Sequence, residues 1–164
     1  MRHLRLLFAF AGCMVLGTSL NAATSSAPLN VTTEVAADCV IATSNLAFGS
    51  YDPLAQNSTQ VLDAAAQVTM VCTRGSRVAV YIDGGRNPAG STRTLSGSSQ
   101  RVSYQLFRDA DRTQEWGSGS ADGRQIVSEG IHKSQQVTVY GRIPPGQEVA
   151  SGMYTDVVTA TVDF

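Results

Sequence analysis

The sequence predicts an all-β protein, an antiparallel sandwich of short strands. Three observations predict it. Only 15% of the 164 residues are charged, and Gly, Ser and Thr are abundant. Short segments in which apolar and polar residues alternate recur at regular spacing, with turn residues between them. Beyond the first 23 residues, no ten-residue stretch has the apolar face of a helix. A chain of this length buries one core rather than two.

The N-terminus has the pattern of a secretory signal peptide. Its first five residues include two arginines and a histidine, an apolar stretch runs from Leu6 to Leu16, and Ala22 and Ala23 offer small residues for cleavage. The apolar stretch is too short to span a bilayer. We therefore expect residues 1–23 to be a signal peptide, the protein to be exported, and the mature chain to carry no stable membrane anchor.

The cysteines fit an exported protein. Cys13 lies in the signal segment, and a lipoprotein site there would follow the unfavourable Phe10, so we expect it to be removed. Cys39 and Cys72 remain, and an even pair in an oxidising compartment favours a disulfide. Two unpaired buried thiols are the alternative. His132 is the one histidine left and has no ligand cluster around it, so no metal or other cofactor is expected.

The first expected strand after the signal lies ahead of Cys39. Residues 29–35 alternate cleanly, which places one row of side chains on a single face. That row is Leu29, Val31, Thr33 and Val35.

Further strands are expected along the rest of the chain. They are Cys39–Ala42, Val61–Cys72, Val78–Ile82, Val102–Phe107, a brief one at Gln125–Val127, Val137–Gly141 and Met153–Phe164. Residues 90–99 are expected to form a loop. The last strand places a second row on one face, namely Tyr154, Val158, Ala160, Val162 and Phe164.

No group of residues predicts catalysis. His132 lies in a polar stretch, where a solvated loop residue is expected rather than a general base. Asp109, Asp111 and Glu115 lack the pattern of a calcium loop and predict a turn. Trp116 could stack on a sugar, but an indole that covers the edge of a sandwich is more common. There is no basic patch, so nucleic acid is not an expected partner. We predict that the protein is not an enzyme.

An ordered series of fragments resembles the spore coat protein U domain family, from about Asp38 to Phe164. No fragment is specific alone, but their order and spacing are. The fragments after Cys39 are Leu46–Asp52, Val68–Cys72, Ile82–Gly85, Arg93–Leu95, Tyr104–Ala110, Trp116–Gly117, Tyr140–Pro144 and Gly152–Asp156. That family includes the subunits of archaic chaperone–usher pili.

The resemblance implies an immunoglobulin-like sandwich of the incomplete pilin type, completed by a donor strand. Such subunits lack their seventh strand, which leaves an open apolar groove. A periplasmic chaperone fills this groove first, and an outer-membrane usher then assembles the fibre, in which the N-terminal strand of an identical or related subunit replaces the chaperone. The chain fits this plan, because it stops directly after its last expected strand and carries an extra strand at 29–35.

The expected organisation follows from this resemblance. Residues 1–23 are the signal, residues 24–37 an extension whose row Leu29, Val31, Thr33 and Val35 is the candidate donor strand, and residues 38–164 the sandwich domain. The C-terminal row is the expected chaperone contact. Residues 29–35 as an ordinary first strand of their own domain are the alternative.

The expected function is a structural subunit of a surface pilus, exported through the periplasm and assembled by donor-strand exchange. The alternatives are a spore-coat or cell-surface protein that does not polymerise, and a carbohydrate-binding surface module.

Overall fold

The computed structural model describes residues 23–97 and 99–164. Most of the expected signal peptide, including Cys13, lies outside the described residues. The chain divides into two units, Met1–Glu34 and Val35–Phe164. In the first unit, residues 23–34 are exposed and form no strand. The strand expected at 29–35 is therefore not formed within the single chain. Alternation alone does not make a strand, because its backbone groups also need a partner.

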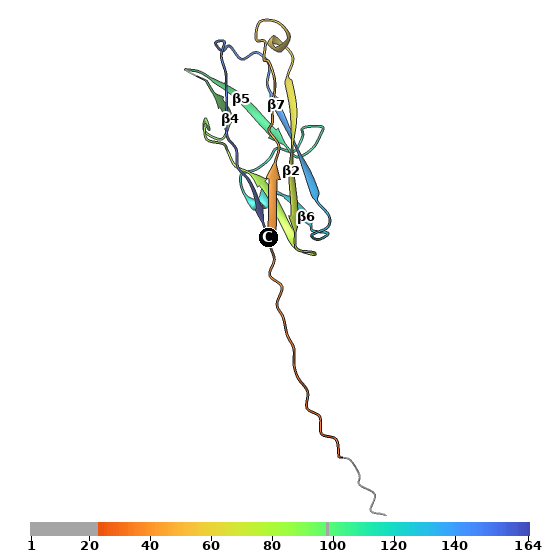
Figure 1. Cartoon of the computed structure of the whole chain (residues 1–164). Coiled ribbons are helices and arrows are strands. Elements are labelled where there is room, and N and C mark those ends of the chain that lie inside the picture. The colour runs from red at the N-terminus through yellow and green to blue at the C-terminus, as the bar shows by residue number, and fades with distance from the viewer. Residues whose placement is uncertain (1–22, 98) are drawn as a thin grey trace, which may run out of the picture. The chain divides into compact units, whose positions relative to one another are not determined.

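The second unit consists of two antiparallel sheets (Figure 1). The strands are β1 (Cys39–Thr43), β2 (Leu62–Cys72), β3 (Arg77–Ile82), β4 (Arg93–Ser96), β5 (Arg101–Phe107), β6 (Arg124–Val127), β7 (Gln135–Ile143) and β8 (Ala160–Asp163). One sheet has the order β1-β2-β7-β5-β4 and the other β6-β3-β8. Two short 3-10 turns, Gln56–Ser58 and Ser120–Asp122, complete the regular structure of the described residues. The expected all-β antiparallel sandwich is confirmed.

The core lies between the sheets and follows the predicted alternation. Every second residue is buried from Ala66 to Cys72 of β2 and from Val137 to Ile143 of β7, as expected for strands with one face on a core. The longest strands of the first sheet, β2 and β7, lie side by side in Figure 1. The buried cluster consists of Val68, Met70, Cys72, Val78, Val80, Ile82, Val102, Tyr104, Leu106, Trp116, Val137, Val139 and Ile143.

Two expected elements differ in the structure. The expected loop at 90–99 contains β4, whose first two residues, Arg93 and Thr94, are buried although polar. Because the buried residues of β4 are polar, its sequence does not show the alternation of apolar and polar residues that predicts a strand. The expected last strand at 153–164 is shortened to β8, because the segment before it changes sheets. Thr155 forms a bridge with Ser96 at the end of β4, whereas Ala160 pairs with Ile82 of β3.

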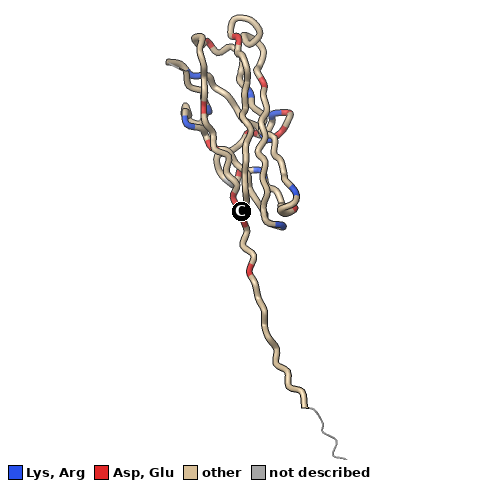
Figure 2. The backbone as a smooth tube through the Cα atoms, viewed as in Figure 1, with Lys and Arg blue, Asp and Glu red and all other residues tan. Residues whose placement is uncertain are grey.

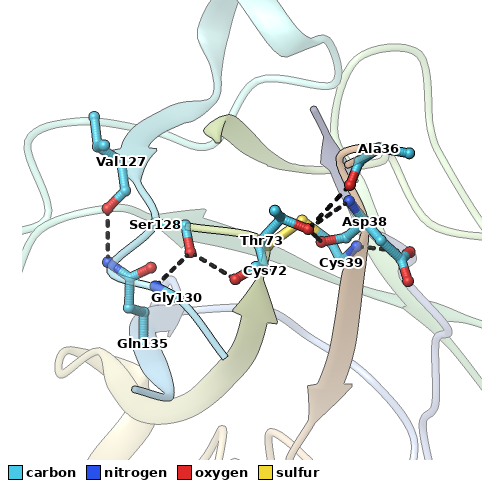
Figure 3. The surroundings of a disulfide bond; sticks show 9 residues. All are labelled: Ala36, Asp38, Cys39, Cys72, Thr73, Val127, Ser128, Gly130 and Gln135. Atoms are coloured by element: carbon cyan, nitrogen blue, oxygen red, sulfur yellow. Dashed lines mark hydrogen bonds between the residues drawn. A yellow bond between two sulfur atoms is a disulfide. The ribbon is translucent and has the colours of Figure 1, made fainter. Parts of the chain in front are cut away.

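The expected disulfide between Cys39 and Cys72 is present and links residues 33 apart (Figure 3). The two cysteines are also register partners of β1 and β2. Around the bond, the Ser128 hydroxyl donates to the carbonyl of Cys72 at 3.0 Å, and the Asp38 amide donates to the Thr73 hydroxyl at 3.1 Å. The start of β1 is therefore fixed to the sheet by a covalent bond and by hydrogen bonds.

Basic and acidic positions are interspersed along the backbone of the second unit (Figure 2). The turn after β5 is organised by Asp109, whose carboxylate accepts hydrogen bonds from the amides of Thr113 and Gln114, as the expected turn requires. Trp116 is 2% exposed and lies in the core rather than at an edge. Within residues 23–97 and 99–164, no helix is long and apolar enough to cross a membrane.

Candidate functional site: a groove between the two sheets

A groove of about 520 Å³ opens into the core between two chain segments. One wall continues from the end of β1 and consists of residues 43–46 with Phe48. The other wall is the C-terminal segment from Asp156 to Ala160. β1 and β8 are outermost strands of their sheets, so the groove lies where each sheet ends.

The floor of the groove is the sandwich core itself. It is lined by Ala66, Val68, Ile82, Leu95, Tyr104, Leu106 and Val139. The floor is therefore mostly apolar, and side chains that entered the groove would pack directly on core residues.

Gly141 on β7 makes room for the first wall. A Cβ atom at Gly141 would lie 2.8 Å from the ring of Phe48 and 3.0 Å from the methyl groups of Leu46. The Phe48 ring also packs edge-on against Tyr104, with centroids 6.2 Å apart. The absence of a side chain at Gly141 thus lets Leu46 and Phe48 settle against the sheet.

The groove has defined ends along the C-terminal segment. Toward the N-terminus of this segment, the Thr155 amide donates to the Ser96 carbonyl at 3.0 Å, and the Ser96 amide donates to the Thr155 carbonyl at 2.8 Å. Toward the C-terminus, β8 lies close to β1 and pairs with β3. The open part therefore extends along five residues, Asp156 to Ala160.

One edge of this segment is free to accept a strand. The Val157 and Thr159 carbonyls accept hydrogen bonds from the amides of Arg86 and Asp83, at 3.1 and 3.0 Å. Successive residues of an extended segment direct their backbone groups to opposite sides. The N–H and C=O groups of Val158 consequently face the groove side, away from β3.

The C-terminal wall of the groove is polar at one lining residue, Asp156. The Tyr104 hydroxyl donates to Oδ2 of Asp156 at 2.7 Å, and Oδ1 accepts bonds from the Arg86 amide at 3.0 Å and from the Asn87 amide at 3.2 Å. Burial, and then the Asp156 carboxylate, raise the pKa of Tyr104 far above its ordinary value. Tyr104 therefore remains protonated and donates to the carboxylate of Asp156 on the C-terminal wall of the groove.

The C-terminal row predicted from sequence is partly brought together. Val158, Ala160 and Val162 are partly buried and pack on the core cluster, as does Tyr154, whose hydroxyl donates to the Ala150 carbonyl at 2.8 Å. Phe164 is 53% exposed. Four of the five predicted residues thus face the core, and two of them line the groove.

The N-terminal row, which was predicted to be the donor strand, is exposed to solvent. Leu29 is 87% and Val31 85% exposed, and Thr33 and Val35 are exposed as well. Burying such apolar side chains is favourable, so this row is available to another surface.

Sequence reasoning missed Asp156, Tyr104, Leu46 and Phe48 as groove residues. All four lie in fragments that carried the family resemblance, but a lone Asp after a Thr has no local pattern that reveals its partners. Among the described residues, no group of three or more His, Cys, Asp or Glu residues could hold a metal ion.

Two antiparallel sheets, with a groove that exposes the core between the β1 wall and the C-terminal segment, define an incomplete β-sandwich of the pilin type. The model of the Spore Coat Protein U domain family matches residues 25–161. Protein U of Myxococcus xanthus is 34% identical over 168 residues, covering 94% of this chain and 93% of that protein. The chain belongs to the spore coat protein U domain family, as its fragments suggested.

A solved structure agrees with the fold. It is the CsuC–CsuE chaperone–tip adhesion subunit pre-assembly complex of the archaic chaperone–usher Csu pili of Acinetobacter baumannii. A chain of that complex is similar with a TM-score of 0.59 at 19% identity, over 79% of this chain. This chain spans 40% of that longer chain.

Proposed function

We propose that the protein is an exported structural subunit of a surface pilus, assembled by donor-strand exchange along a chaperone–usher route. The observation that carries this proposal is the groove. It joins an apolar floor to a free backbone edge, which is the combination that an added β-strand requires. The groove thus supports a structural role for the protein.

The donor in this proposal is the exposed row Leu29, Val31, Thr33 and Val35 of another copy. Each apolar side chain that it buries contributes roughly 1.5 to 3 kcal/mol before the cost of ordering the segment. Backbone hydrogen bonds to the free edge beside Val158 add directional pairing. The same groove would hold a periplasmic chaperone before assembly, and an outer-membrane usher would exchange the two.

A spore-coat protein is the second candidate. The family name and the similarity to Protein U across 93% of that protein favour it. A coat protein that does not polymerise would leave the groove without a donor. A sugar-binding module finds less support, because the indole of Trp116 is buried and offers no stacking face.

Assembly of the secreted chain tests the proposal. Wild-type protein should form oligomers that survive detergent in the cold and dissociate on heating. Val31→Asp should abolish them, because it would place a charge in the apolar groove. Asn30→Asp adds the same charge on the opposite face of the segment and should leave the oligomers intact. Monomeric wild-type protein, or equal losses in both variants, would contradict donor-strand exchange and favour the coat protein.

A further inference from the structure

The C-terminal wall of the groove carries one polar lining residue, Asp156, and the donor row carries one polar residue, Thr33. The spacing of these two residues within their segments selects one register. This inference rests on the proposed function and deepens it, because it states which donor residue faces which part of the groove.

The groove admits three donor side chains. Its open part lies along Asp156 to Ala160, between the Thr155–Ser96 bridge and the approach of β8 to β1. An extended segment that pairs with five residues presents alternate side chains to one face, so the inner face holds positions opposite residues 160, 158 and 156. The donor row has four members, and one must therefore lie outside.

The three positions differ in polarity. Two of them lie opposite the apolar residues Ala160 and Val158, over a floor that includes Val68, Leu106 and Val139. The position opposite Asp156 faces a carboxylate that already accepts the Tyr104 hydroxyl. Its Oδ2 takes one of the hydrogen bonds described above, whereas a carboxylate oxygen can accept two.

Orientation follows from the sheets themselves. Every strand pair of the two sheets is antiparallel, and antiparallel pairing is slightly more stable per residue than parallel pairing. An antiparallel donor has its residue numbers rise as those of the C-terminal segment fall. Leu29 then lies opposite Ala160, Val31 opposite Val158, and Thr33 opposite Asp156.

The neighbouring register is less favourable. A shift by two residues would place Thr33 opposite Val158 and Val35 opposite Asp156. The threonine hydroxyl would then lie opposite the apolar Val158, away from the carboxylate, and a valine would cover the carboxylate. Both mismatches disappear in the first register.

We propose that Thr33 of the donor copy sets the register by donating its hydroxyl hydrogen to the carboxylate of Asp156, while Leu29 and Val31 fill the apolar part of the groove. Val35 lies beyond the groove in this arrangement. Thr33 is a positioning residue, and Leu29 and Val31 supply the apolar burial.

Charge at position 33 tests the proposal. The acceptor is the full secreted chain with Val31→Asp, which cannot act as its own donor, and the probe is a fluorescent peptide of residues 27–37. The Thr33→Lys peptide should bind at least as tightly as the wild-type peptide, because its ammonium meets Asp156. The Thr33→Glu peptide should bind at least ten-fold more weakly through like-charge repulsion. Val35→Asp should change binding by less than about three-fold, since position 35 remains in solvent.

The outcomes separate register from function. Equal losses for the lysine and glutamate peptides, or a large loss for Val35→Asp, would overturn the register and leave donor-strand exchange standing. A wild-type peptide that neither binds nor increases the yield of folded acceptor on refolding would overturn both.

Cross-linking gives a geometric test that does not depend on affinity. The acceptor carries an added Val158→Cys, and two peptides carry Val31→Cys or Thr33→Cys. Directly opposite residues of an antiparallel pair have Cα atoms about 4.5 to 5.5 Å apart, within the range that a disulfide spans. Mass spectrometry should find several-fold more adduct with the Val31→Cys peptide. More adduct with Thr33→Cys would establish the shifted register instead.

Discussion

Nη2 of Arg93 donates a hydrogen bond of 2.9 Å to the backbone carbonyl of Ile82, and this bond joins the two sheets. Arg93 lies on β4 of one sheet and Ile82 on β3 of the other. The same guanidinium bonds the carbonyls of Asp83 at 2.8 Å and Trp116 at 3.1 Å. With a side chain that is 7% exposed overall, Arg93 satisfies three carbonyl groups near the groove floor.

Replacing Arg93 should therefore destabilise the domain strongly. Arg93→Met keeps much of the side-chain length but leaves buried carbonyls without a donor, each at a cost of about 1 to 3 kcal/mol. We expect a loss of about 3 kcal/mol in the free energy of unfolding, measured by urea denaturation. Arg101→Met, at an exposed position on β5, should change it by about 0.5 kcal/mol or less. Similar losses in both variants would contradict the role of Arg93 between the sheets.

Arg93 also illustrates what the sequence could and could not predict. β2, β5 and β7 were predicted because their apolar residues alternate, and alternation indicates a buried face directly. β4 was missed because its buried residues, Arg93 and Thr94, are polar and are satisfied by distant carbonyls that no local pattern reveals.

The candidate site was predicted to a similar degree. The Cys39–Cys72 disulfide is confirmed, whereas the roles of both rows of the proposed exchange stay predictions. The predicted extent of the last strand was wrong. The segment pairs with β4 at Thr155 and with β3 at Ala160, and this change of sheet depends on tertiary contacts that a local sequence pattern does not show. Asp156 acquires its place in the groove only through contacts with Tyr104 and Asn87.

The stability of the domain should fall below about pH 4. Burial raises the pKa of Asp83, but hydrogen bonds from the amides of Thr159 and Gly85, with the charge of Arg93, outweigh it and hold the pKa below the ordinary value of 3.8. A lowered folded pKa gives stability that is present above the unfolded pKa and is lost as pH falls through the folded pKa. Thermal midpoints measured from pH 6 to pH 2 should show this decline.

Asp83→Asn provides the control for this pH dependence. Its amide oxygen can still accept the hydrogen bonds from Thr159 and Gly85, but it does not titrate. The decline in midpoint between pH 4 and pH 2 should therefore be shallower in the variant. An unchanged slope would assign the decline to other carboxylates, such as Asp63, whose pKa is lowered mainly by its hydrogen bond from Arg142.

Loss of the disulfide should weaken both the fold and the groove wall. Cys39 begins β1, and the chain that follows β1 forms one wall. Closing a loop of 33 residues stabilises a fold by roughly 3 to 4 kcal/mol. The double variant Cys39→Ser with Cys72→Ser should lose this amount, and a reducing agent should lower the stability of the wild type but not of the variant. Two free thiols in denatured, unreduced protein would contradict the bond.

Gly141 should not tolerate a side chain. A Cβ atom there would press on Phe48 and Leu46, and because these residues form the groove wall, they would have to move toward the opening. We expect Gly141→Ala to cost about 1 to 3 kcal/mol through overpacking and to weaken binding of the 27–37 peptide. Gly119→Ala is the matched control, since a Cβ atom at Gly119 would have no neighbouring atom within 4 Å. Retained stability in Gly141→Ala would mean that the wall adjusts without strain.

Chaperone capture should depend on the C-terminal wall and not on the donor segment. If a chaperone strand occupies the groove before assembly, it pairs with the free edge beside Val158 and covers Ala160. Val158→Asp in the secreted chain should abolish co-purification with a co-expressed cognate chaperone, and so should deletion of residues 162–164. Val31→Asp alters only the donor, so this variant should be captured as well as the wild type although it cannot form oligomers.

Asp163→Asn, at an exposed position of β8, controls for a general effect of changing this strand. Loss of capture in Val31→Asp would place the chaperone on the N-terminal segment, and undiminished capture of Val158→Asp would remove the groove as its binding site.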